Sequence, residues 1–79
     1  MSHVPHELHE EFPDATQKLH DLKVGNAHFA RLADEYHEVN REIHRIETEV
    51  TPAADEVVEQ LKKQRLNLKD QIAAMLHDA

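Results

Sequence analysis

Cysteine is absent from this sequence of 79 residues, which contains only one glycine and three prolines. The lack of cysteine excludes disulfides, thiolate nucleophiles, cysteine zinc sites and iron–sulfur clusters, and it suits a reducing compartment. A single glycine excludes the glycine-rich loops that cradle phosphates. A turn-rich sheet is disfavoured as well, because glycine and proline form most tight turns. These absences favour a helical, cytoplasmic protein.

Long apolar runs are also absent, because nowhere do about 18 consecutive apolar residues occur. Residues 1–11 are polar and rich in histidine, so we expect neither a signal peptide nor a membrane span. A chain this short forms one domain at most and buries too little apolar surface to enclose a large ligand cavity. It also shows no nucleophile beside a base in a shielded site. We therefore expect no catalytic activity, no cofactor and no small-molecule substrate.

Acidic residues outnumber basic ones, with 16 Asp and Glu against 9 Lys and Arg, which gives a net charge of −7 with neutral histidine. This charge repels the phosphate backbone of nucleic acids. Four bases of the last third nevertheless lie close together in a basic strip: Lys62, Lys63, Arg65 and Lys69. Such a strip is usually a solvated helix face. Weak nucleic-acid contact through it is a minor alternative, and nucleic acid is not the expected partner.

A short amphipathic helix is predicted for residues 13–24, where apolar residues have helical spacing. Pro13 is suited to the beginning of this helix or to a kink in it. Gly25 and Asn26 form the clearest break in the chain, because glycine favours a helix C-terminus and the asparagine side chain can cap the next helix.

A strict heptad pattern follows and predicts a helix near residues 27–49, with the pattern itself running from Phe29 to Val50. Its apolar residues recur at steps of three and four: Phe29, Leu32, Tyr36, Val39, Ile43, Ile46 and Val50. A second pattern of the same kind runs through residues 52–77: Val58, Leu61, Arg65, Leu68, Ile72 and Met75. Val57, Leu66 and Leu76 widen this second stripe. Narrow stripes of this period predict coiled-coil-like packing of two helices, and we call the two stripes together the seam.

The predicted fold is all-α, with a short N-terminal helix followed by a long antiparallel helical hairpin whose heptad stripes face each other. Thr51 and Pro52 are suited to the cap and first residue of the last helix, and so short a connection turns the chain back. We expect residues 13–79 to form this single domain and residues 1–12 to be a mobile, histidine-rich extension. A hairpin covers one side of each stripe, so the short helix, a second copy or another protein must cover the rest.

Arg65 is the one residue that breaks the apolar seam. In an antiparallel hairpin it lies near Tyr36, Val39 and Asn40. Glu35 and Glu42 are within reach on the acidic edge of the preceding helix. One interpretation is that its guanidinium reaches a carboxylate at this edge or across a dimer interface, while its aliphatic stem packs on the seam. The other interpretation is that the guanidinium extends into water.

Two runs of residues resemble a known family. They are Asn26-Ala27-His28-Phe29-Ala30-Arg31-Leu32 and Leu61-Lys62-Lys63-Gln64-Arg65-Leu66-Asn67-Leu68-Lys69-Asp70-Gln71-Ile72. Over about residues 13–77 the chain is similar to the YdcH-like family of small bacterial helical proteins. The resemblance implies a helical hairpin and a domain of unknown function, and it supplies no catalytic residues.

Eight histidines are the unusual feature of the composition. His3, His6 and His9 are three residues apart and would share one face of a helix, a spacing that permits metal binding without specifying it. Solvated histidines and weak adventitious metal binding are the ordinary interpretations of this spacing. His37 and His44, seven residues apart in the second helix, are predicted to face solvent.

The sequence therefore favours a cytoplasmic module that binds a protein partner, or a second copy of itself, along the seam. The alternative is a sensor whose histidines bind metal or respond to pH.

Overall fold

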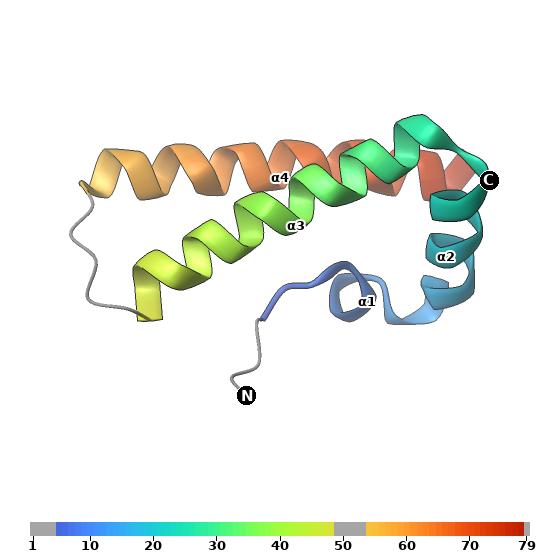
Figure 1. Ribbon diagram of the computed structural model, residues 1–79, viewed down its shortest axis with the longest axis horizontal. Helices are drawn as coiled ribbons and strands as arrows, with labels where there is room; N and C mark the ends of the chain where they lie inside the picture. The colour runs from blue at the N-terminus through green and yellow to red at the C-terminus, as the bar shows by residue number, and fades with distance from the viewer. Residues whose placement is uncertain (1–4, 49–53, 79) are drawn as a thin grey trace.

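The computed structural model describes residues 5–48 and 54–78, and all secondary structure within these ranges is helical (Figure 1). The elements in chain order are α1 (Leu8–Glu11), the 3-10 helix η1 (Pro13–Ala15), α2 (Thr16–Gly25), α3 (Ala27–Thr48) and α4 (Asp55–Asp78). The all-α prediction is thus confirmed for the described part of the chain. None of these helices is long and apolar enough to cross a membrane.

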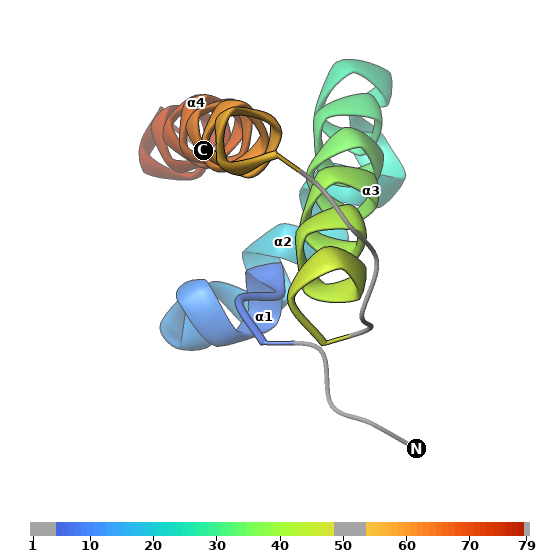
Figure 2. The ribbon, with the colours of Figure 1, turned by 90° about the vertical axis from the view of Figure 1, so that its left-hand side faces the viewer.

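Helices α3 and α4 form the predicted antiparallel hairpin. Their ribbons overlap in Figure 1 where α3 begins and α4 ends, and they separate toward Thr48 and Asp55 in both views (Figures 1 and 2). Figure 2 shows α4 and the N-terminal elements α1 and α2 on the same side of α3. Helix α3 is therefore the central element, in contact with α4 and with α2.

The buried stripe of α3 is wider than a two-position heptad stripe because this helix packs against two neighbours. Its buried residues are Phe29, Leu32, Ala33, Tyr36, Val39, Asn40 and Ile43. Helix α4 buries only Leu68, Ile72 and Leu76. The predicted widening of its stripe is confirmed for Leu76 and is wrong for Val57 and Leu66, which are 51% and 58% exposed. A helix that packs mainly against one neighbour needs only a narrow stripe, so these two side chains remain on the surface.

Pro13 begins a new element, but the α-helix itself starts three residues later. Phe12 has φ −129° and ψ 64°, outside the helical region, as expected for a residue that precedes proline. The 3-10 helix follows, and the Thr16 hydroxyl donates a hydrogen bond to the carbonyl of Pro13 at 3.1 Å. The single turn of α1 before this point was not predicted.

Asn26 forms the corner between α2 and α3. Its backbone N–H donates to the Leu22 carbonyl at 2.8 Å, and its side-chain oxygen accepts a hydrogen bond from the Phe29 N–H at 3.0 Å. The first bond closes α2 and the second caps α3. The predicted break at Gly25 and Asn26 is confirmed, whereas Val50, Thr51 and Pro52 lie outside the described residues.

Candidate functional site

The seam is covered by the chain's own elements where α3 begins. Phe29 of α3 and Ile72 of α4 are fully buried there, and Leu19 of α2 belongs to the same core. Leu8 and Phe12 pack against this core from the N-terminal side. The N-terminal elements therefore cover part of the seam. The sequence analysis expected this cover from the short N-terminal helix, from a second copy of the chain or from another protein. As a contact surface for a partner, the seam stays a prediction.

Residues 5–12, which we call the N-terminal segment, are attached to α3 through main-chain carbonyl groups. The Tyr36 hydroxyl donates to the carbonyl of His6 at 2.5 Å, and the Asn40 amide donates to the carbonyl of Pro5 at 2.8 Å. His6 has a φ of 65°, a left-handed conformation that is uncommon for residues other than glycine. The domain boundary after residue 12 and the mobility of residues 1–12 stay predictions.

Asn40 lies at the polar centre of the hairpin. It is 1% exposed and is the buried polar residue of the described part of the chain. Arg65 of α4 donates a hydrogen bond to its side-chain oxygen at 2.9 Å. The expectation that the guanidinium reaches Glu35 or Glu42 is therefore wrong within the described chain, since its partner is a neutral amide one helical turn from Tyr36. Antiparallel pairing predicted Asn40 as a neighbour of Arg65 but not as the hydrogen-bond partner of the guanidinium.

Two titrating groups around this centre have shifted pKa values. Burial raises the pKa of Tyr36 to about 12, the negative charge of Glu11 adds to the effect, and the positive charge of Arg65 opposes it. Burial alone raises the pKa of Glu11, but hydrogen bonds and charges from Lys69 and His6 together outweigh burial and leave it below its ordinary value. At neutral pH the Tyr36 hydroxyl therefore stays protonated and Glu11 stays ionised.

The basic strip of α4 is largely engaged inside the molecule. Lys62 lies 3.5 Å from Glu47 of α3, and Lys69 lies 3.3 Å from Glu11 of the N-terminal segment. Arg65 is the third member with an internal partner. Three of the four cations therefore join α4 to the rest of the fold, which weakens the case for nucleic-acid binding through this strip.

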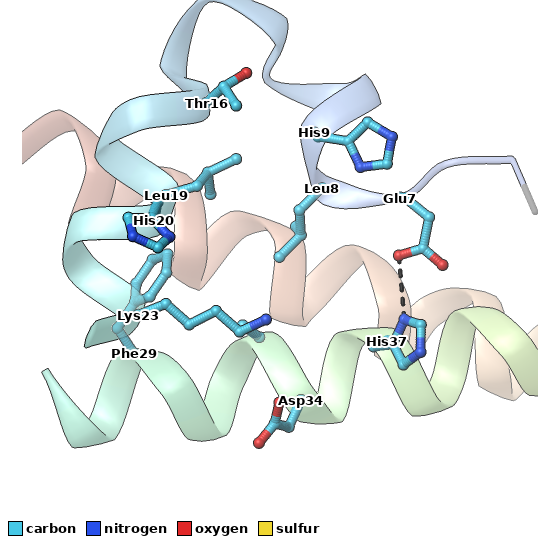
Figure 3. Close-up of a pocket in the computed structure, with 11 residues that line it drawn as sticks. Glu7, Leu8, His9, Thr16, Leu19, His20, Lys23, Phe29, Asp34 and His37 are labelled. Carbon is cyan, nitrogen blue, oxygen red and sulfur yellow. Dashed lines mark hydrogen bonds and ion pairs between the residues drawn. The ribbon is translucent and has the colours of Figure 1, made fainter. Parts of the chain in front are cut away.

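A cavity of about 360 Å³ opens between α1, α2 and α3 (Figure 3). Its apolar wall consists of Leu8, Leu19, Phe29 and Ala33. Its polar rim consists of Glu7, His9, Thr16, His20, Lys23, Asp34 and His37. In Figure 3, Leu8 and Leu19 point into the space between the helices, and an ion pair of 3.2 Å joins His37 to Glu7 at its edge. The cavity can accept an apolar side chain.

The histidines of the described residues do not form a metal centre. No group of three or more His, Cys, Asp or Glu side chains within residues 5–48 and 54–78 could hold a metal ion. His6 instead lies 3.3 Å from Glu11, and His9 is on the rim of the cavity. His3 lies outside the described residues, so metal binding by His3, His6 and His9 together stays a prediction.

Comparison with known proteins agrees with the two sequence runs. A family model described as "Protein of unknown function (DUF465)" matches residues 29–76, which is more than half of the chain and most of α3 and α4. YdcH-like proteins are members of that family, so the resemblance is confirmed. Searches of curated proteins and of solved structures gave no match.

Proposed function

The chain belongs to the DUF465 family of proteins of unknown function, and from its geometry we propose that it is a non-catalytic, cytoplasmic module that binds a helix of a partner protein. The observation that carries this proposal is the course of the seam. It is sealed where α3 begins, but it continues into the end of the hairpin where α3 and α4 separate (Figures 1 and 2). We call this end, between Thr48 and Asp55, the fork.

Apolar side chains at the fork are incompletely covered. They are Ile46, Val57, Val58 and Leu61, of which Val57 is more than half exposed and the others are half-buried. Phe29 and Ile72 are by contrast fully buried in the sealed part of the same stripes. A helix with an apolar stripe of the same period is the partner that matches this arrangement, because it can continue the knobs-into-holes packing.

The size of this surface indicates a modest affinity. Complete burial of one Val, Leu or Ile side chain is worth about 1.5–3 kcal/mol, and three of the four fork residues are already partly buried. Association costs at least about 4 kcal/mol of lost translational and rotational freedom. The fork alone therefore supports a transient complex, and a stable one needs further contacts along the outer faces of α3 or α4.

Support for a non-catalytic role comes from the interior. Asn40 is the buried polar residue of the described chain, and both its amide nitrogen and its oxygen are hydrogen-bonded. An amide is neither a nucleophile nor a base, so this buried group does not supply the shielded pair that covalent catalysis requires.

The proposal can be tested with a matched pair of exposed residues on α4. Val57 lies four residues before Leu61 and so shares the seam face, whereas Leu66 is about 140° around the helix from Leu61. Tagged wild-type protein, Val57→Asp and Leu66→Asp would be used to capture partners from cells of origin, with circular dichroism as the check on folding. We expect one protein to bind the wild type and Leu66→Asp but not Val57→Asp.

Sedimentation velocity of the purified chain identifies the case in which this partner is a second copy. In that case the weight-average mass rises with concentration for the wild type and Leu66→Asp only. If the captured protein and the association state were the same in all three forms, the fork would not be the binding surface.

The alternative of a pH-responsive protein is favoured by one specific observation. Two ion pairs, His6 with Glu11 and His37 with Glu7, involve the N-terminal segment. A pH response through these pairs would appear as pH-dependent amide hydrogen exchange of residues 7–12, corrected for intrinsic rates. Unchanged protection would remove this alternative.

A further inference from the structure

A second, smaller cavity lies in the fork between α3, α4 and the N-terminal segment. Its volume is about 150 Å³, roughly five times the share of one water molecule in the liquid. The polar side chains that line it are His6, Asn40, His44, Glu47, Lys62 and Arg65. It is too small for a nucleotide or a peptide side-chain cluster, and its size suits a small ion.

Arg65 in the wall of this cavity has no ion-pair partner among residues 5–48 and 54–78. The residue is half-buried, and its hydrogen-bond partner in these ranges is the neutral Asn40 side chain. Asn40 is in turn occupied by Pro5 through its amide nitrogen. Burial of a cation is costly unless an anion balances it. A guanidinium also carries five N–H donors, so donors remain for an anion in the cavity.

The rest of the lining leaves the cavity positive, although the whole chain is acidic. Lys62 is offset by Glu47 at 3.5 Å, so Arg65 supplies a net charge of about +1 with both histidines neutral. The His44 imidazole is a further donor within the lining, whereas the Nδ1 N–H of His6 is engaged by the Glu11 carboxylate at 3.3 Å. A planar guanidinium beside a lysine is the combination that binds phosphate and sulfate groups well.

We propose that this cavity binds a small tetrahedral oxyanion of the phosphate class, held mainly by Arg65 with help from Lys62. The bound ion supplies the charge that Arg65 lacks. It also bridges α3, α4 and the N-terminal segment, so it holds the fork together. This site is distinct from the partner-binding surface, because the cavity lining includes none of its residues Ile46, Val57, Val58 and Leu61.

The test is a titration of tag-free, isotope-labelled protein with inorganic phosphate at constant ionic strength, followed by amide chemical shifts. We expect saturable shifts confined to the residues around the fork cavity. Arg65→Gln should weaken binding by at least about tenfold, because charge-assisted hydrogen bonds are lost. Lys62→Gln, a change at a half-exposed side chain that should not affect folding, should weaken it severalfold.

Lys63→Gln is the matched control, because Lys63 is an exposed neighbour that carries the same charge and does not line the cavity. Its affinity should equal that of the wild type. A loss as large as that of Lys62→Gln would show general attraction to the basic strip and would overturn the proposal, as would shifts that do not saturate. Acetate as tight as phosphate would overturn the assignment to a tetrahedral ion.

A further arm with methyl phosphate identifies the source of the phosphate group. Binding equal to that of inorganic phosphate would support a ligand in which the group belongs to a small organic molecule. Binding restricted to inorganic phosphate would support the free ion.

Discussion

Replacement of Tyr36 with phenylalanine removes one hydroxyl from the centre of the seam and leaves the ring in place. The hydroxyl donates a 2.5 Å hydrogen bond to the carbonyl of His6, and the residue is 1% exposed. A hydrogen bond of this kind contributes about 0.5–1.5 kcal/mol, and a carbonyl left unpaired can cost somewhat more. Tyr36→Phe should therefore lower the free energy of unfolding at neutral pH by about 1–2 kcal/mol, as measured by urea denaturation.

The same hydroxyl has a distinct signature at alkaline pH. Its folded pKa is about 12 against an ordinary value of 10.0. Because the folded value is the higher one, this contribution to stability is complete below pH 10 and is lost as the pH rises through 12. A difference of two units corresponds to up to about 2.7 kcal/mol. The wild type should therefore lose more stability over this interval than Tyr36→Phe does.

The assay is direct because the sequence has one tyrosine and no tryptophan. Tyrosinate absorbance then follows Tyr36 alone, and it should titrate near 12 in the native protein and near 10 in urea. A native titration near 10, or equal alkaline losses in wild type and Tyr36→Phe, would refute the burial and hydrogen bonding assigned to this residue.

Three further changes test other parts of the structure. Ile43→Asp should lower the free energy of unfolding by several kcal/mol or prevent folding, because it buries an unpaired charge. His37→Ala, at a half-exposed position, should barely shift the melting temperature. Equal shifts in the two variants would contradict the register of the seam. The lowered pKa of Glu11 means that its contribution to stability is present above about pH 4.5 and is lost as the pH falls through the folded value. Glu11→Gln should thus reduce acid sensitivity in urea unfolding, and no reduction would argue against its ion pairs. Calorimetric titration of tag-free protein with Zn²⁺ or Ni²⁺ should show at most weak binding, and a submicromolar site that survives deletion of residues 1–11 would contradict this.

The hairpin could be predicted from the sequence because the apolar residues of its two helices recur with a regular period. Residues 27–49 and 52–77 repeat apolar side chains over several turns, and the break at Asn26 lies between two such patterns. The attachment of the N-terminal segment leaves no such trace. It depends on the main-chain carbonyls of Pro5 and His6, which every residue possesses, and α1 is a single turn, too short to show a period.

The partner of Arg65 shows a second limit of the sequence. Antiparallel pairing placed this residue beside Tyr36 and Asn40, and the structure agrees with that neighbourhood. Which polar group meets the guanidinium depends on the rotation of α3 about its axis, and adjacent residues differ by about 100°. Asn40 meets the guanidinium because its side chain is buried. This burial arises because α3 packs against two neighbours rather than one.

The bonds between α4 and the elements before α3 have a consequence for synthesis on the ribosome. The Lys18 amine donates to the Leu76 carbonyl at 3.1 Å, and Lys69 donates to Glu11, so each bond joins residues 58 positions apart. Closing so long a loop is entropically costlier than closing the hairpin, and α4 is synthesised after the elements that it joins. We expect hydrogen exchange to open residues 7–12 at a lower free energy than α3. The N-terminal segment, although synthesised before α4, therefore completes its packing after the hairpin, with Leu8 and Phe12 incompletely covered in the meantime.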